Sequence, residues 1–329
     1  MKNRRLLIII FAIFALGIGI VISWKQKDFT TTKITPSPSP RTAAFPPAIT
    51  LVENAPVNVA FSFVNAPPVF PTTLPVYHVQ NFEYQSGELS LIAKSFGFSS
   101  APIKKSVGSS SKSIWSLPSK SLSFYTDGLS QDWSFISKES TPLTGLGVGA
   151  PEIASTIKTI FLLPNNLQLV LNNKNTGPFD GVQLDKPTQL PLMGFSFFAV
   201  VNKTYPLVSQ TFEPSLSTII VDSLGGVVSL SYSTPPNIIV AGDKPILSVE
   251  EALGGLNNNL GVLVFSGRKS GNVFWGDQPS FQSVALSAVS IVYYQSPSTK
   301  TLVPFFLFDG LATTPDGVID VRYAISAIE

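Results

Sequence analysis

The sequence predicts an α+β, strand-dominated fold, in which an N-terminal transmembrane helix and a proline-rich linker precede antiparallel sheets that each pack with a short helix. Three observations support this prediction. Residues 6–24 form an unbroken apolar run, residues 35–40 carry proline at every second position, and short apolar segments recur through most of the chain after residue 50. The 24 phenylalanines and the low charged fraction of 13% also favour β-structure.

The apolar run predicts an uncleaved, single-pass membrane anchor of a bacterial protein. Nineteen uncharged residues at about 1.5 Å per residue give a helix of about 28 Å, close to the hydrocarbon thickness of a bilayer, so the bilayer is the expected partner of residues 6–24. Arg4 and Arg5 precede the run, which favours a cytoplasmic N-terminus and an extracytoplasmic remainder. A cleaved signal peptide is the alternative, but it needs a shorter apolar core and small residues where Trp24 and Lys25 stand.

Four regions are expected along the chain. Residues 1–27 form a cytoplasmic stub and the transmembrane helix, and residues 28–50 form a Pro/Ser/Thr-rich linker. Residues 51–147 and residues 148–329 form a first and a second extracytoplasmic α+β subdomain. Alternating prolines favour extended polyproline II, so the linker is either a spacer that sets the reach of the folded part or a tether with no such role.

Three short helices are predicted, at residues 86–96, at residues 150–163 and from Ser248 onward. Ser86 is a suitable N-cap for the first helix. The third helix has the clearest signature, because Ser248 is followed three residues later by Glu251. In such a capping box, the serine side chain and the glutamate side chain each accept a hydrogen bond from the other residue's backbone N–H group.

Strands account for most of the remaining sequence, with turn signals at Asp127-Gly128 and Gly225-Gly226. Because a helix followed by several strands occurs about three times, the sequence predicts copies of one unit, a helix lying across an antiparallel sheet. The expected strands are residues 51–64, 74–79, 113–117, 121–126, 133–137, 195–201, 205–212, 216–222, 227–232, 261–265, 284–294, 301–309 and 318–328.

Composition excludes several kinds of site. The chain has no cysteine, which excludes a thiol nucleophile, a disulfide and a cysteine-based metal site. Its single histidine, His78, excludes zinc sites that use two or three histidines. The net charge of +2 and the lack of a basic run after the N-terminus argue against a nucleic-acid partner. No cofactor is expected, and a small-molecule ligand stays an open question.

The last two predicted helices and their strands carry a set of distinctive segments. These are Tyr205-Pro-Leu-Val, Val221-Asp-Ser-Leu-Gly-Gly-Val-Val, Ser248-Val-Glu-Glu-Ala-Leu, Val292-Tyr-Tyr and Leu302-Val-Pro-Phe-Phe-Leu-Phe-Asp-Gly. Together they resemble a known family, the YycH/YycI-type single-pass extracytoplasmic regulatory proteins, and more loosely PepSY-like α+β modules. The resemblance extends over about residues 74–137 and 195–328. It implies a protein that binds another envelope protein and has no active site, although the linker and residues 138–194 depart from the family pattern.

Two Ser-x-x-Lys segments, at residues 109–112 and 266–269, match the first motif of exported serine acyl-enzymes. The other motifs of those enzymes fit poorly. Ser-Gly-Asn at residues 270–272 directly follows the second segment and therefore cannot occupy a separate loop. Lys-Asn-Thr-Gly at residues 174–177 has one residue more than the Lys-Thr-Gly motif of those enzymes. In a chain this rich in serine, such matches are expected by chance.

His78 is a candidate general base, but it stands in a predicted strand, where a structural histidine is the more common case. The pair Asp316 and Asp320, and the pair Asp127 and Asp132, are candidate calcium ligands. Neither pair has the alternating oxygen ligands of a calcium loop, and Asp-Gly is an ordinary turn pair, so both fit turns better.

Three tryptophans, Trp115, Trp133 and Trp275, lie in or beside predicted strands. Exposed, they would suit a sugar-binding face. Buried, they would belong to the core, which is the preferred interpretation because large aromatic side chains dominate β-sheet cores.

These observations favour a non-enzymatic binding or regulatory protein that acts on another component of the cell envelope, most simply another envelope protein. No catalytic, cofactor-binding or metal-binding residue is predicted. A cell-wall carbohydrate-binding or structural envelope protein is the first alternative. A hydrolase built on serine and lysine is the second.

Overall fold

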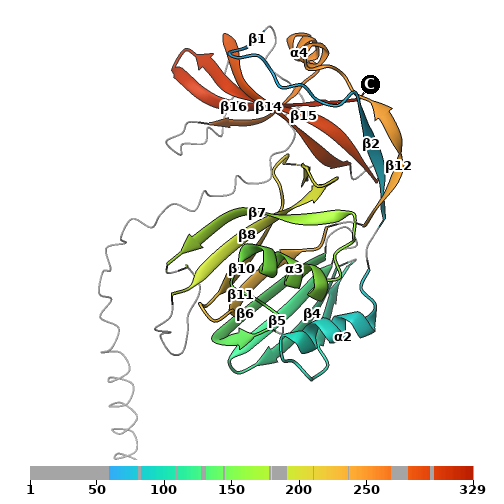
Figure 1. The fold of residues 1–329 in the computed structure, drawn as a ribbon, viewed down its shortest axis with the longest axis vertical. Coiled ribbons are helices and arrows are strands. Elements are labelled where there is room, and N and C mark those ends of the chain that lie inside the picture. Colours follow the sequence, from blue (N-terminus) through green and yellow to red (C-terminus); the bar gives the residue numbers. More distant parts are fainter. Residues whose placement is uncertain are drawn as a thin grey trace, which may run out of the picture. The chain divides into compact units, whose positions relative to one another are not determined.

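The computed structural model shows how the chain folds after residue 58 (Figure 1). The described residues all belong to one compact unit of the chain, which begins at Pro46. Strands predominate in them, and they contain three helices. The described residues are 59–80, 83–108, 110–126, 131–143, 145–177, 179, 191–209, 211–235, 237–267, 281–296 and 300–328.

Eight antiparallel strands form what we call the central sheet. Buried and exposed residues alternate along β6, so one face of the sheet lies in the core and the other faces outward. The strand order is β7 (Leu167–Thr176), β8 (Met193–Val201), β10 (Leu216–Val221), β11 (Gly226–Ser233), β6 (Gln131–Pro142), β5 (Lys120–Thr126), β4 (Ser110–Leu117) and β3 (Ile103–Val107).

Two helices, α2 (Ser86–Ser95) and α3 (Ala150–Ile160), cover the inner face of the central sheet (Figure 1). Ile92 of α2 and Ile153 of α3 are buried in one apolar cluster together with the sheet residue Phe135. Burying a side chain of this size contributes roughly 1.5–3 kcal/mol. The two helices therefore share a single core and do not each cover a separate sheet.

The remaining strands form what we call the C-terminal sheet, which is built around the long antiparallel hairpin of β14 and β15. β16 and β13 extend it beyond β15, β2 and β12 join β15 near the hairpin tip, and β1 lies parallel to β14. The bounds are β1 (Ala60–Phe63), β2 (Thr73–Gln80), β12 (Asn237–Pro245), β13 (Val262–Gly267), β14 (Ser283–Ser296), β15 (Thr301–Thr314) and β16 (Gly317–Ser326).

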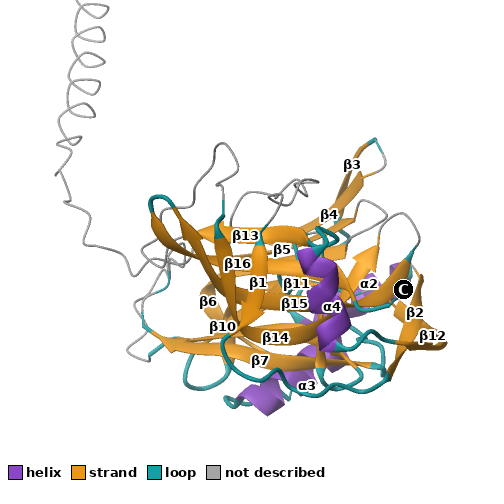
Figure 2. Ribbon diagram, turned by 90° about the horizontal axis from the view of Figure 1, so that it is seen from above, coloured by secondary structure: helices purple, strands orange, loops and turns teal. Residues whose placement is uncertain are grey.

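Helix α4 (Val249–Asn257) covers one face of the C-terminal sheet and lies beside β1 and β16 (Figure 2). Its buried residues Ala252 and Leu256 belong to the same apolar cluster as Phe306 and Tyr323. The Tyr323 ring meets the ring of Phe61 edge to face at 4.9 Å, which ties β1 into this core.

The short strand β9 (Tyr205–Val208) joins the two sheets. It pairs antiparallel with the end of β8 and parallel with β14. Tyr293 of β14 stabilises the junction, because its ring lies 5.4 Å from that of Tyr77 and 6.0 Å from that of Tyr205. Its hydroxyl donates a hydrogen bond to the carbonyl of Pro75 at 2.8 Å. The paired strands thus run without a break from β12 to β3.

The predicted capping box of α4 is confirmed. The backbone N–H of Glu251 donates to the Ser248 hydroxyl at 3.1 Å, and the N–H of Ser248 donates to the Glu251 carboxylate at 2.7 Å. The predicted N-cap of α2 is wrong by one residue. The cap is Gln85, whose N–H donates to Glu88 at 2.7 Å, and not Ser86.

The turn between β10 and β11 is also confirmed at Gly225-Gly226. Asp222 is buried beside it and accepts hydrogen bonds from the backbone N–H groups of Leu224 and Gly226, both at 2.8 Å. The Ser140 hydroxyl donates to the second carboxylate oxygen at 2.5 Å. The Asp222 carboxylate therefore serves to stabilise this turn.

The predicted transmembrane helix requires a correction to the fold class. No helix of the described residues has the length and apolarity needed to cross a bilayer. These helices have 9 to 11 residues, which gives about 14–17 Å against a hydrocarbon thickness of about 30 Å. The run at residues 6–24 and the linker at residues 28–50 lie outside the described residues. The assignment as a single-pass membrane protein is therefore without structural support.

The expected sheet arrangement is also wrong. Separate antiparallel sheets with one helix each were expected, whereas the observed sheet is mixed and continuous, with parallel pairs at β1/β14 and β9/β14. Three copies of one unit are not found either, since α2 and α3 share one core. Hydrophobic periodicity shows which face of a strand is buried, but it does not show which strand lies beside it.

Most individual strands are found where they were expected, with ends that differ by a few residues. β3, β7 and β12 were not predicted. Residues 205–212 form only the short strand β9 followed by a connection, not one long strand. The turn signal at Asp127-Gly128 lies outside the described residues. The division into subdomains at residues 147 and 148 stays a prediction.

Candidate functional site

The serine–lysine motifs are not assembled into a site within the described residues. Ser266 lies in β13 of the C-terminal sheet, opposite Val321. Lys112 and Lys174 lie in β4 and β7, near opposite ends of the central sheet. Ser109, Lys269 and the Ser-Gly-Asn segment lie outside the described residues.

The histidine and aspartate candidates stand apart from one another. His78 is exposed on β2, between Ile239 of β12 and Thr301 of β15. Asp316 lies in the β15–β16 turn and its N–H donates to the Thr314 hydroxyl at 3.3 Å, while Asp320 lies in β16. Across the described ranges, no group of three or more His, Asp or Glu side chains can hold a metal ion. Asp127 lies outside those ranges.

Two of the three candidate tryptophans are core residues, as the preferred interpretation predicted. Trp115 and Trp133 are 2% and 1% exposed, and their rings stack at 6.2 Å within the cluster under α2 and α3. They therefore cannot form an exposed sugar-binding face. Trp275 lies outside the described residues.

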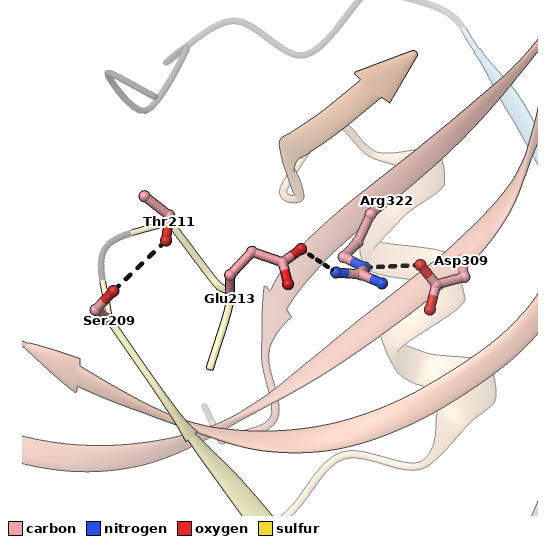
Figure 3. Close-up of polar contacts among 5 residues, drawn as sticks. All are labelled: Ser209, Thr211, Glu213, Asp309 and Arg322. Carbon is pink, nitrogen blue, oxygen red and sulfur yellow. Dashed lines mark hydrogen bonds and ion pairs between the residues drawn. The ribbon is translucent and has the colours of Figure 1, made fainter. Parts of the chain in front are cut away.

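One charged cluster links the β9–β10 connection to the C-terminal sheet (Figure 3). Arg322 of β16 donates through Nε to Asp309 of β15 at 2.7 Å, and through Nη1 to Glu213 at 2.5 Å. Burial lowers the pKa of the Arg322 guanidinium, but the hydrogen bond and charge of Asp309 and the charge of Glu213 outweigh it, so the net pKa is raised. With two carboxylates already bound, Arg322 fixes this connection and is poorly suited to bind an anion.

Phe212 fixes the same connection through an apolar contact. Its ring is 2% exposed and stacks on Tyr294 at 4.8 Å, with Phe305 at 5.3 Å. Phe212 belongs to a cluster with Val292 and Leu307, which point to the face of the C-terminal sheet opposite α4. Its φ of 55° is in the left-handed region, so the contact holds a backbone conformation that phenylalanine rarely adopts.

The outer face of the central sheet carries a feature of another kind, a row of hydroxyl side chains across five neighbouring strands. Each member is the direct cross-strand partner of the next. At about 4.8 Å per strand, the row is about 19 Å long. We call it the hydroxyl row. Its members, in order from β5 to β8, are Ser123, Ser134, Ser231, Thr218 and Ser196.

The central members of the hydroxyl row are available for binding. Ser134, Ser231 and Thr218 are exposed, and their hydroxyls have no protein partner within the described part of the chain. Ser196 at the end of the row accepts a hydrogen bond from Asn172 Nδ2 at 3.3 Å. The adjacent positions on the same face add more hydroxyls, at Ser121 of β5 and elsewhere on β4 and β11.

The sequence contained a signal for this row that the prediction did not use. Serine recurs at every second position in Ser229-Leu-Ser-Tyr-Ser233 and in Ser121-Leu-Ser123, a spacing that places all of them on one strand face. The alignment of these serines into one row was not predictable, because β11 pairs with β6 across more than 80 residues of sequence.

Comparisons with known proteins do not add to this description. A search of known protein families finds no family model that matches the chain, and a search of curated proteins finds no match. The resemblance to YycH/YycI-type and PepSY-like proteins therefore stays a prediction.

Proposed function

We propose that this protein is a non-enzymatic binding module, which contacts another component of the cell envelope, outside the cytoplasm, through the outer face of its central sheet. The hydroxyl row is the observation that supports the proposal. Among the described residues, the hydroxyls of its central members have no protein partner, and they stand at a regular spacing on a rigid sheet whose other face is fixed by a large apolar core.

The arrangement suits binding because its geometry is set before a ligand arrives. The side chains between the hydroxyls along each strand, such as Phe135 and Leu230, are buried at 0% and 2% exposure. The backbone under the row is therefore held in place, and little conformational entropy is lost on binding.

A photo-reactive amino acid at position 134 tests the proposal in intact cells. The expected result is a discrete covalent adduct, which is absent when the same amino acid replaces the exposed Ser290 of β14. Failure to form an adduct from position 134, or equal adducts from both positions, would argue that the outer face is not a contact surface.

Strand addition by a partner protein is a second candidate function, favoured by the edge strand β12. It pairs with β2 on one side only in the described sheet, and its residues Ile239 and Val240 are 47% and 61% exposed. An exposed apolar edge strand can accept a strand of a partner. Val240→Lys is expected to abolish capture of a protein partner in cells, and unchanged capture would exclude this edge.

A further inference from the structure

We propose that the hydroxyl row binds an uncharged polysaccharide, which lies across the strands of the central sheet. This inference rests on the proposed binding function and adds the chemical class of the ligand. It follows from three properties of the row: the hydrogen-bonding character of its side chains, the charge around it and the lack of a tryptophan ring on the described part of this face.

The first property is the character of the hydroxyl group. Each serine or threonine hydroxyl supplies one donor and two acceptors, and it rotates to suit its partner. A sugar hydroxyl has the same dual character, so a row of hydroxyls can meet sugar hydroxyls in either direction. A carboxylate or phosphate only accepts, and a surface that selects for it normally presents Lys, Arg or aligned backbone N–H groups.

The second property is the low charge of the centre of the face. The described neighbours of the row along β6 and β10 include Ile136, which is 51% exposed, and Ile220. Among the charged side chains that share the same alternation, Asp132 is as near to Ser134 along β6 as Ile136 is, and Lys138 lies beyond Ile136. On the side of the row that carries Ile136, an uncharged polymer that presents hydroxyls and C–H groups can cover the face without leaving a charge buried and unpaired.

The third property concerns strength. Trp115 and Trp133 are buried in the core on the other face, so the described part of this face offers no tryptophan ring for stacking on a sugar. Its aromatic rings include Tyr125, which is 36% exposed on β5, and the half-buried Phe198 of β8, and these two strands carry the ends of the row. Contacts to the middle of the row are then single weak hydrogen bonds, and useful affinity needs many of them along one chain. The ligand is therefore expected to be a polymer, with short oligosaccharides binding much more weakly.

The test is sedimentation of the full-length protein with insoluble cellulose and insoluble chitin as uncharged polymers, and retention on alginate as an anionic one. The variant S134A/T218V/S231A removes three hydroxyls and keeps the side-chain sizes close to the originals. The matched control, S111A/S290A, removes two exposed hydroxyls outside the row.

The expected result is retention on cellulose or chitin that added salt does not reduce, about tenfold or more weaker for the triple variant and unchanged for the control. Equal urea midpoints for both variants would show that loss of binding is not loss of folding. Should the triple variant unfold more easily, the single variant S134K, which introduces a charge at an exposed position, is expected to lose binding in the same way.

The inference is overturned by the absence of retention on both uncharged polymers, by undiminished retention of the triple variant, or by salt-sensitive binding to alginate alone. Those outcomes leave the proposed function standing if the adduct from position 134 still forms in cells, because the ligand would then be of another class. Absence of the adduct together with absence of retention removes both proposals.

Discussion

The two sheets of this protein differ in how their second faces are used. The inner face of each sheet is covered by helices, α2 and α3 on one and α4 on the other. The second face of the C-terminal sheet is apolar around Val292 and Leu307, where Phe212 of the β9–β10 connection covers it. The outer face of the central sheet carries hydroxyls and is exposed at Ser134 and Thr218.

The comparison shows that the side chains of a sheet face are apolar where another segment covers that face, and polar where the described chain leaves it uncovered. Where a connection returns over a sheet, apolar side chains gain free energy by leaving water, and the face becomes part of a core. Where nothing in the described chain covers the face, small polar side chains keep that face hydrated. The outer face uses hydroxyls where charges are the commoner choice, which is the basis of the proposed binding surface.

The largest expected effect comes from removing the ring that covers the C-terminal sheet. Phe212→Ala should destabilise the protein by roughly 3–5 kcal/mol, because it opens a cavity between Tyr294 and Phe305. Phe198→Ala, the same change at a half-buried position on the outer face of β8, should cost much less. Urea unfolding of both variants measures the difference, and equal losses would contradict the contrast between the two faces.

The hairpin of the C-terminal sheet gives the next effect. A Cβ at Gly310 would lie 2.5 Å from the carbonyl oxygen of Ala285 and 3.0 Å from the Cα of Leu286, where β14 carries a bulge. Because backbone atoms cannot move aside as a flexible side chain can, Gly310→Ala should destabilise the protein by roughly 1–3 kcal/mol.

Gly254→Ala is the matched control for that change. A Cβ at Gly254 in α4 meets nothing within 4 Å, so this substitution should stabilise the protein by about 0.5–1 kcal/mol. Thermal unfolding distinguishes the two variants by the sign of the change. A neutral Gly310→Ala variant would mean that the hairpin is not this closely paired.

Alkaline pH should lower the stability of the protein against unfolding. Burial raises the pKa of Tyr84 to about 12, and it also raises the pKa of Tyr232, Tyr293 and Tyr323 above their ordinary value of 10. Below pH 10 these tyrosines are neutral in both the folded and the unfolded state, so they do not make the free energy of unfolding depend on pH. Above pH 10 the unfolded chain loses protons first, so stability should fall by up to about 1.4 kcal/mol per pH unit for each tyrosine, until pH reaches the folded pKa.

Tyr232→Phe sharpens this measurement. The Tyr232 hydroxyl is buried and has no hydrogen-bond partner in the described structure, so removing it breaks no hydrogen bond. Urea midpoints between pH 8 and pH 11.5, values chosen around the ordinary tyrosine pKa of about 10, should fall less steeply in this variant. A wild-type midpoint that stays constant above pH 10 would show that these hydroxyls are not buried.

The smallest effect is expected at the charged cluster. The Arg322 and Glu213 side chains are 28% and 49% exposed, so solvent screens their ion pair. Arg322→Met should cost about 1 kcal/mol or less, with the loss shrinking at high salt. A loss of several kcal/mol that is insensitive to salt would show that this cluster, rather than Phe212, is what holds the β9–β10 connection on the C-terminal sheet.

Local features of the sequence predicted local structure well, and one case shows why. The capping box from Ser248 to Glu251 needs only neighbouring atoms, so it could be identified from four residues. The antiparallel pairing of β14 with β15 was predictable for the same reason, since a short connection leaves few alternatives. The buried positions of Trp115 and Trp133 followed from their size and apolar character.

Pairings between distant segments could not be predicted. β9 has two partners, β8 nearby and β14 almost 90 residues away, and nothing in its four residues specifies the second. The position of Phe212 was missed for a related reason. Residues 205–212 have the apolar character of a strand, but the strand ends at Val208, and a turn follows in which the Phe212 N–H donates to the Ser209 carbonyl at 3.0 Å. The ring is then fixed by Tyr294 and Phe305, which are remote in sequence.

The sequence by itself determined the three short helices, most of the strands and the alternation of serine along β5 and β11, because each depends on contacts within a few residues. Only the tertiary structure decided that Ser123, Ser134, Ser231, Thr218 and Ser196 stand side by side. A row across strands is made by register, and register is set by the apolar side chains of the opposite face as they pack under α2 and α3.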